Sequence, residues 1–290
     1  MTTFTLAGLQ LALTPGTDNF PLIREQVLAT KRRYPNLDMI LLPELCTFGP
    51  APRFAEPLPG PAEQRYSQLA IEAGVWLCNG SLFEREGDQI YNTSSVIAPN
   101  GSVHCRYRKM YPFLPYEVGV TAGTEFTVFD IPDVGRFGLS ICYDMWFPES
   151  IRALVWQGAE VILHPTLTNT IDRNVELAIA RANACTNQCY LIDINASGTM
   201  GVGQSIIAGP GGEVIHQACV HHEAIVVELD LAYLRRTRRQ GWHSLGQPLK
   251  SFRDHPLPFP QYQPGARSEA LDQLGALEKP ASRNWTHGSF

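Results

Sequence analysis

Short apolar runs recur along the chain, and most have the length and composition of β-strands. Many are rich in Val, Ile, Leu and Phe and stop at Gly, Pro, Asn or Asp, as expected for a strand that ends in a turn. The pattern predicts strands at residues 4–13, 39–42, 75–78, 89–98, 102–107, 126–131, 136–141, 160–163, 190–194, 205–208, 214–217 and 224–229. Several consecutive runs are close enough to form hairpins, so the sheets are expected to be mixed.

Other segments between the strands have apolar side chains at helical spacing. Helices are predicted from near Pro21 and over about residues 62–73, 149–157 and 173–186. These helices cover only one face of a sheet, so the other face must be buried by something else. A second sheet provides that cover. The chain is therefore predicted to be an α/β protein with two sheets packed face to face.

The pattern changes after residue 232. A basic run at residues 235–239 is typical of a solvated face or a helix end. From Pro248 onward the chain is rich in proline and shows little periodicity. We therefore predict one domain at residues 1–232 and an extended C-terminal tail at residues 233–290, which packs on the domain or on a partner subunit.

Composition and charge narrow the class of protein. The chain has 290 residues, 44% hydrophobic, and a net charge of -5, which argues against a nucleic-acid partner. Its seven cysteines are odd in number and scattered, which favours a reducing compartment over a disulfide framework. No apolar run is long enough to cross a membrane, and no apolar leader precedes Arg24. We expect a cytoplasmic protein that binds neither nucleic acid nor a membrane.

Three residues that could take part in catalysis each follow a predicted strand. They are Glu44, Lys109 and Cys142, and their side chains converge if the strands share one sheet. A buried glutamate can take the proton of a thiol, and an ammonium can lower the thiol pKa and stabilise an oxyanion. Together they would suffice for attack on a carbonyl or nitrile carbon. Taken singly, they could equally be an exposed glutamate, a lysine that ends a hairpin and a buried thiol.

The residues around these positions resemble a known family. Residues 41–44, 107–110 and 138–149 are similar to the three signature blocks of the nitrilase superfamily of carbon–nitrogen hydrolases. Further similar segments lie at residues 91–101, 157–162, 180–187 and 203–212. The resemblance covers about residues 4–230, with the three blocks in order.

The resemblance implies an αββα sandwich of two mixed β-sheets with outer helices, commonly paired into dimers with an αββααββα core. A homodimer or a higher homo-oligomer is therefore expected. It implies that Glu44 is the general base, Cys142 the nucleophile and Lys109 the oxyanion partner, together with the Tyr143 N–H. Ammonia would leave and water would then hydrolyse a cysteine thioester. No metal or other cofactor is implied, and the histidines and cysteines show no spacing typical of a metal site.

The family pattern also includes a second glutamate between the lysine and the cysteine. Glu117 matches it best, whereas the competing Glu125 lies where the family begins its next strand. For the substrate-binding wall we expect Tyr143, Trp146 and Thr166.

The branch of the family decides the substrate. Residues 142–149 are similar to N-carbamoylputrescine amidases, whereas residues 109–117 are more like aliphatic amidases and formamidases. D-Amino-acid carbamoylases carry paired arginines where this chain has Met145 and Trp146. A small primary amide or a carbamoyl compound is therefore the expected substrate. Nitrile hydrolysis, acyl transfer to an amine and a catalytically idle binding homologue are the alternatives.

Overall fold

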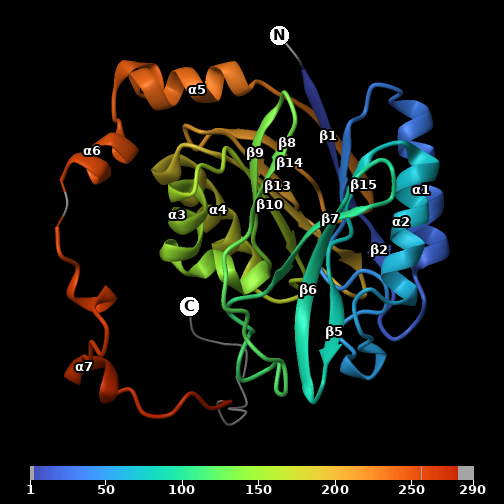
Figure 1. Ribbon diagram of the computed structural model, residues 1–290, viewed down its shortest axis with the longest axis horizontal. Helices are drawn as coiled ribbons and strands as arrows, with labels where there is room; N and C mark the ends of the chain where they lie inside the picture. Colours follow the sequence, from blue (N-terminus) through green and yellow to red (C-terminus); the bar gives the residue numbers. More distant parts are fainter. Residues whose placement is uncertain (1–2, 256, 280–290) are drawn as a thin grey trace, which may run out of the picture.

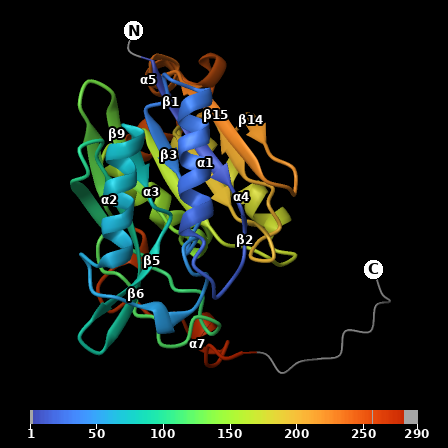
Figure 2. The same ribbon diagram turned by 90° about the vertical axis from the view of Figure 1, so that its right-hand side faces the viewer.

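The computed structural model describes residues 3–255 and 257–279, which form four layers in the order helix, sheet, sheet, helix (Figure 1). Helices α1 (Phe20–Arg33) and α2 (Pro61–Ala73) stand side by side on the outside of one sheet (Figure 2). Helices α3 (Pro148–Trp156) and α4 (Arg173–Asn187) cover the other sheet. The predicted sandwich of two mixed sheets with outer helices is confirmed. None of the described helices is long and apolar enough to cross a membrane.

The first sheet has seven strands in the order β15-β1-β3-β4-β6-β5, with β7 paired to β6. Its strands are β1 (Phe4–Gln10), β3 (Met39–Leu41), β4 (Trp76–Cys78), β5 (Leu82–Glu86), β6 (Gln89–Ile97), β7 (Val103–Arg108) and β15 (Glu223–Leu229). Strand β3 is parallel to β4, β6 is antiparallel to β4, and β7 is antiparallel to β6. Strands β3 and β7 therefore run the same way, and their carboxyl ends lie at the same edge.

The second sheet has six strands in the order β14-β13-β11-β10-β9-β8. Its strands are β8 (Val128–Ile131), β9 (Gly135–Leu139), β10 (Val161–Thr166), β11 (Tyr190–Asn195), β13 (Ile206–Ala208) and β14 (Val214–Gln217). Strands β9, β10 and β11 are parallel. A two-stranded sheet of β2 (Ala12–Leu13) and β12 (Ser197–Gly198) joins the segments that follow β1 and β11.

The core is divided among the layers. One apolar cluster, which contains Leu6 and Phe137, fills the space between the two sheets. A second lies between the first sheet and its helices, and a third lies between the second sheet and its helices. The adjacent residues Leu6 and Ala7 of β1 belong to different clusters, because side chains alternate between the two faces of a strand and both faces are covered.

Some predicted boundaries differ from the structure. Strand β5 was not predicted, because three of its five residues are charged; Glu84 is stabilised there by Arg108 of β7. The predicted strand at 136–141 ends at Leu139, and a 3₁₀ turn (Cys142–Trp146) precedes α3. Short 3₁₀ turns also occur at Pro52–Phe54, Trp242–Ser244 and Pro260–Tyr262.

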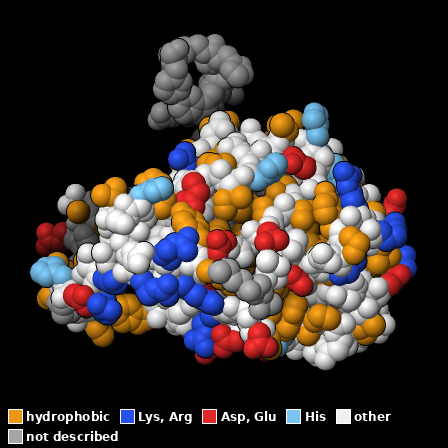
Figure 3. Space-filling view, turned by 90° about the horizontal axis from the view of Figure 1, so that it is seen from above, with side chains coloured by type: hydrophobic (Ala, Val, Ile, Leu, Met, Phe, Trp, Pro, Cys, Tyr) orange, Lys and Arg blue, Asp and Glu red, His pale blue; other side chains and the backbone are white. Residues whose placement is uncertain are grey.

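The start of the predicted tail is helical, not extended. Helix α5 (Leu231–Gln240) crosses the predicted boundary at 232, because Leu231 and Leu234 pack into the core between the sheets. The basic run forms the surface of this helix (Figure 3). Within the run, however, Arg235 pairs with Glu160, so the run is not simply a solvated face.

Beyond α5 the chain passes around the outside of α3 and α4 (Figure 1). Two further short helices lie along it, α6 (Pro248–Asp254) and α7 (Glu269–Asp272). The end of the predicted tail, residues 280–290, lies outside the described residues.

Candidate active site

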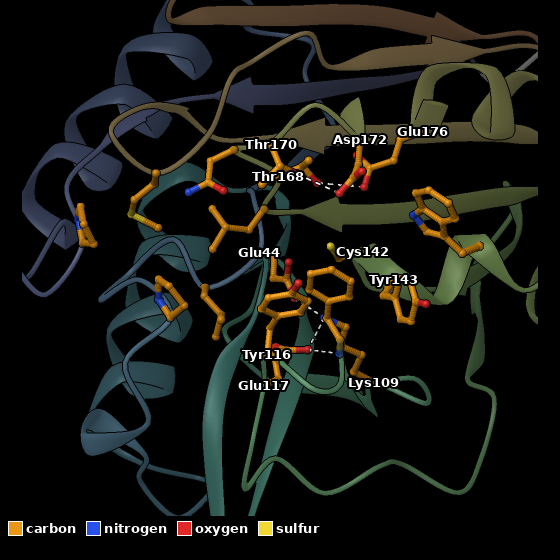
Figure 4. A pocket seen from close by; sticks show the side chains of 18 of the residues that line it. Glu44, Lys109, Tyr116, Glu117, Cys142, Tyr143, Thr168, Thr170, Asp172 and Glu176 are labelled. Atoms are coloured by element: carbon orange, nitrogen blue, oxygen red, sulfur yellow. Dashed lines mark hydrogen bonds and ion pairs between the residues drawn. The ribbon is translucent and has the colours of Figure 1, made fainter. Parts of the chain in front are cut away.

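The four predicted catalytic side chains, Glu44, Lys109, Glu117 and Cys142, line one cavity of about 490 Å³ (Figure 4). Glu44 follows β3 and Lys109 follows β7, both in the first sheet. Cys142 follows β9 in the second sheet. The three strands do not all share one sheet, yet their ends still converge, because the site lies where the edges of two facing sheets meet.

Glu44 is buried, with 2% of its surface exposed. Its Oε1 accepts hydrogen bonds from Asn92 Nδ2 at 2.8 Å and from Lys109 Nζ at 2.9 Å. The chain before Glu44 packs tightly against Gly80, where a Cβ atom would lie 1.8 Å from the Pro43 carbonyl oxygen. Gly80 also has φ +74°, a conformation that glycine adopts readily. The position of the glutamate therefore depends on a glycine in a different loop.

Lys109 is shared between two carboxylates. Its Nζ donates to Glu44 Oε1 and to Glu117 Oε2, each at 2.9 Å. An ammonium carries three protons, so one remains for a further acceptor. Gly123 N–H donates to the Lys109 carbonyl at 2.8 Å and returns the loop that carries Glu117 to the end of β7. Among the described residues that line the cavity, Glu117 is present and Glu125 is not.

Cys142 lies at a turn that is fixed by a buried carboxylate. Its φ of +47° lies in the left-handed region, which non-glycine residues seldom adopt. Asp144 Oδ2 accepts hydrogen bonds from Ile141 N at 2.8 Å and from Tyr107 Oη at 2.7 Å, and Oδ1 accepts from Tyr111 N at 2.8 Å. Asp144 thus ties the thiol-bearing turn to the segment around Lys109.

Asp144 was not predicted as a site residue, although it lies two residues after the thiol. Burial raises the pKa of Asp144 to about 6, against the lowering effect of its hydrogen bonds. Asn92 was also not predicted as a site residue. The feature that could have indicated it is a polar amide side chain within strand β6, where it is buried.

The electrostatics of the cavity keep the thiol protonated at rest. Burial raises the pKa of Cys142 well above its ordinary value, and the nearby Glu44 adds to this against the effect of Lys109. Burial also raises the pKa of Glu44, although Lys109 opposes the shift. Burial by itself lowers the pKa of Lys109, but the negative partners around it reverse this and raise the pKa well above its ordinary value. The site therefore combines a neutral thiol, a permanent cation and a carboxyl group with increased affinity for a proton.

The substrate wall differs from the prediction at one position. Tyr143 and Trp146 line the cavity as expected, but Thr166 is not among the lining residues. Strand β10 runs to Thr166, three residues beyond its predicted end, so the chain reaches the cavity only at Leu167 and Thr168. Thr166 contributes through its backbone carbonyl, which accepts the Glu44 N–H at 3.2 Å.

The N-terminal end of α4 adds two acidic residues that were not predicted, the N-cap Asp172 and Glu176 in the first turn. Asp172 and Glu176 line the cavity on the opposite side of Cys142 from Lys109 and Glu117 (Figure 4). The sequence signal available was a cluster of polar residues at the start of a predicted helix, a pattern that ordinary helix starts also show.

Comparison with known proteins adds independent findings. The sequence model of the family described as carbon–nitrogen hydrolase matches residues 6–239. The omega-amidase NIT2 of Mus musculus is 31% identical over 263 residues, which cover 83% of this chain and 93% of the mouse protein. The omega-amidase NIT2 of Xenopus tropicalis is 33% identical over 206 residues, 65% of this chain and 74% of that protein.

Two solved structures have a similar fold. Nit3 of Saccharomyces cerevisiae, a member of branch 10 of the nitrilase superfamily, aligns with TM-score 0.75 and 25% identity, over 82% of this chain and 93% of Nit3. A mutant of the amidase from Nesterenkonia sp. AN1 aligns with TM-score 0.72 and 25% identity, over 81% of this chain and 94% of that chain. In that structure the acetamide moiety of fluoroacetamide is added covalently at the active-site cysteine.

These findings confirm the expected class of enzyme. They support hydrolysis of amide C–N bonds through a covalent cysteine intermediate, on the αββα fold that the strands and helices form here. The chain belongs to the carbon–nitrogen hydrolase family.

Proposed function

We propose that Glu44, Lys109, Glu117 and Cys142 hydrolyse a small primary amide or carbamoyl compound and release ammonia. The observation that carries the proposal is the single cavity in which a thiol, a shared ammonium and two carboxylates meet. Each side chain has a distinct task, and the geometry supports a definite order of steps.

The first half of the reaction forms a thioester. Because Cys142 is protonated at rest, its proton passes to Glu44 as the sulfur attacks the amide carbon. The free proton of the Lys109 ammonium and the Tyr143 N–H stabilise the resulting oxyanion. The raised pKa of Glu44 suits the next step, because a carboxyl with higher proton affinity both takes the thiol proton and delivers it to the leaving nitrogen. Ammonia departs and the acyl group stays on sulfur.

The second half hydrolyses the thioester. Glu44 is again a carboxylate and removes a proton from the attacking water, and that proton returns to the sulfur when the tetrahedral intermediate collapses. Lys109 stabilises the oxyanion as before, and Glu117 holds the ammonium in place through its 2.9 Å hydrogen bond. The products are a carboxylic or carbamic acid and the free thiol.

We extend the proposal to a homodimer in the reducing cytoplasm. Support for a dimer comes from the outer helix layer, where Trp156 of α3 is 68% exposed and Val175 of α4 is 49% exposed. Such apolar surface is commonly covered by another subunit. Support for a reducing compartment comes from seven cysteines that all carry free thiols, including the nucleophile. Light scattering that gives a mass near twice 32.2 kDa supports the dimer, and a monomer mass contradicts it.

The test of the catalytic proposal is ammonia release by the wild type and by Cys142→Ala. The panel contains primary amides, carbamoyl amines, carbamoyl amino acids and nitriles. Loss of the nucleophile is expected to lower kcat by a factor on the order of 10⁴ or more. Cys185→Ala is the matched control, because Cys185 is exposed and does not line the cavity.

The intermediate provides a second measurement. Mass spectrometry of wild-type enzyme quenched during turnover is expected to show the acyl adduct on Cys142. An unreactive wild type across the whole panel, with no adduct, would favour a catalytically idle binding protein. Equal activity in wild type and Cys142→Ala would rule out the thiol mechanism.

A further inference from the structure

Residues 166–168, at the carboxyl end of β10, touch both the proposed base and the proposed nucleophile. The Thr166 carbonyl accepts the Glu44 N–H at 3.2 Å. The next residue contributes the Leu167 N–H, which is a hydrogen-bond donor to the Cys142 thiol. Leu167 also lines the cavity. The position of this segment therefore bears on how the carboxylate and the sulfur lie relative to each other.

The side chain of Asn195, the last residue of β11, holds both backbone groups of Thr168. Its Oδ1 accepts the Thr168 N–H at 2.9 Å, and its Nδ2 donates to the Thr168 carbonyl at 3.0 Å. Nδ2 also donates to the Gly203 carbonyl at 2.9 Å, in the loop that follows β12. Two carbonyls and one N–H require two donors and one acceptor, which a primary amide offers and a carboxylate or a hydroxyl does not. Asparagine is therefore matched to this place by its hydrogen bonds.

Asn195 is itself held by a buried network. It is fully buried, and its backbone N–H donates to Ser205 Oγ at 2.9 Å. The Ser205 hydroxyl in turn donates to Gln10 Oε1 at 2.8 Å. Gln10 ends β1 of the first sheet, and both Ser205 and Gln10 are fully buried. A satisfied buried polar network is rigid, so Asn195 ties the segment beside the cavity to both sheets.

The placement of this segment matters for the chemistry. Burial and the nearby Glu44 raise the pKa of Cys142, whereas the Leu167 N–H lowers it. In the proposed mechanism negative charge develops on the sulfur as its proton leaves, and a donor fixed beside the sulfur stabilises that charge. A displacement of about 1 Å among reacting groups can lower a rate about 100-fold. A residue that fixes the segment can therefore affect the rate without touching the substrate.

We propose that Asn195 is a positioning residue, which fixes residues 166–168 so that Glu44, Cys142 and the Leu167 N–H keep their relative positions during both half-reactions. The inference rests on the proposed function, because it assumes that Cys142 is the nucleophile and Glu44 its base. Asn195 is absent from the described residues that line the cavity, so it acts through the backbone that it holds. The competing interpretation is that Asn195 only joins two loops and stabilises the fold.

Asn195→Ala tests the residue, because it removes all three side-chain hydrogen bonds. For the amide that the wild type hydrolyses, kcat is expected to fall by about tenfold to a hundredfold. KM should change little, because the side chains that line the cavity are unchanged. Asn187→Ala is the matched control: it also removes a buried amide, which donates to the Asn183 carbonyl within α4 at 2.9 Å, away from the cavity. Both variants are expected to melt at a lower temperature, but only Asn195→Ala should lose kcat.

The reactivity of the thiol provides a measurement that needs no substrate. Iodoacetamide reacts with the thiolate, so the pH dependence of alkylation reports the thiol pKa. Site-resolved mass spectrometry should show that Asn195→Ala alkylates at Cys142 about tenfold more slowly at neutral pH, with the profile displaced to higher pH. The exposed Cys185 in the same samples is the internal reference, and its rate should not change. A residue that only stabilises the fold would leave the Cys142 profile in the folded variant unchanged.

Ser205→Ala provides a second variant if Asn195→Ala does not fold. It removes the hydroxyl that accepts the Asn195 N–H, but it leaves the amide side chain in place. The same changes in kcat and in Cys142 alkylation are expected, reduced to about threefold to tenfold, the range of one net hydrogen bond.

Three results would overturn the inference. The first is wild-type kcat together with a wild-type Cys142 alkylation profile in folded Asn195→Ala. The second is an equal loss of kcat in Asn187→Ala at the same loss of melting temperature. The third, if Asn195→Ala does not fold, is a wild-type alkylation profile in Ser205→Ala. Failure of the proposed function would look different, because the wild type itself would then release no ammonia from any amide in a Cys142-dependent way.

Discussion

Two buried cations in this molecule are each shared by two carboxylates, yet their surroundings differ. Lys109 lies at the edge of a cavity, beside the thiol of Cys142, with one proton not used by its partners. Arg173 is sealed behind the cavity wall, where its guanidinium binds Glu176, Asp193 and a backbone carbonyl. The same charge arrangement therefore borders a cavity in one place and holds a wall in the other.

The difference follows from the side chains themselves. A lysine ammonium is a compact charge with three donors, and two partners leave one donor for an oxyanion. An arginine has a planar fork whose donors match carboxylates, so its partners fix it rigidly. Mutations should therefore distinguish the two clusters, that is, each cation with its carboxylate partners. Changes around Lys109 should lower the reaction rate, and changes around Arg173 should lower the stability of the fold.

The largest expected effect is on the rate. Glu44→Gln keeps the size of the side chain but removes the proposed general base, so kcat should fall by about 10²- to 10⁴-fold. The melting temperature should not fall, because burial already disfavours the charged form of Glu44. Ammonia release and thermal unfolding measure the two effects. Glu125→Gln, outside the cavity, should leave the rate unchanged; an equal loss in both variants would contradict the assignment of Glu44.

The next effect is on stability. Arg173→Met leaves Glu176 and Asp193 buried without their cation, and breaking such a pair costs about 3–5 kcal/mol. Urea unfolding measures this loss. Arg24→Met is the control, because its pair with Glu72 is exposed and should contribute less than about 1 kcal/mol. If Arg173→Met unfolded at the wild-type denaturant concentration but lost its activity, the distinction between the two clusters would be wrong.

The smallest expected effect concerns His164, a buried histidine that feels charges from the surroundings of both cations. The ring of His164 is buried, with Nδ1 3.1 Å from Ser140 Oγ, and it feels the charges of Glu176, Arg173 and Lys109. Burial is the main cause that lowers the pKa of His164 from 6.5 to about 3. Between pH 6.5 and about pH 3, the unfolded chain therefore binds a proton at His164 that the folded chain does not. The contribution of the neutral histidine to stability is complete above pH 6.5 and is lost as the pH falls toward 3.

The measurement is the pH dependence of unfolding in the wild type and in His164→Asn. The wild type should lose about 1–2 kcal/mol more than the variant between pH 6.5 and about pH 5. The slope is compared, not the absolute stability, because the substitution also changes packing. Identical slopes would show that His164 does not titrate in this way.

Much of the layer structure was readable in the sequence because it depends on local pattern. The strands that became β3, β10 and β11 are nearly continuous apolar runs, as expected when both faces of a sheet are covered. Strand β5 was missed because its charged residues are stabilised only by a neighbouring strand. Helix α5 was hidden by its arginines, since Leu231 and Leu234 are the only apolar residues among its buried positions.

Some residues of the site were predicted from the sequence and others were not. Glu44, Lys109 and Cys142 were recognisable from the residues around them, and the structure places all three in one cavity. Thr166 was misplaced because a strand boundary moved by three residues. Asp172 was not recognisable, because an acidic residue at a helix start is ordinary and only the cavity beside it makes it notable.

The sequence by itself determined most of the strands and helices in their order, the family, and the three residues expected to do the chemistry. These follow from local periodicity and from short motifs, which need no knowledge of distant contacts. Only the tertiary structure decided that the site spans two sheets, that Lys109 is divided between Glu44 and Glu117, and that acidic residues face them across the cavity. Burial and charge at those positions are set by segments far apart in the chain, such as Gly80 against Pro43, and no local pattern encodes those contacts.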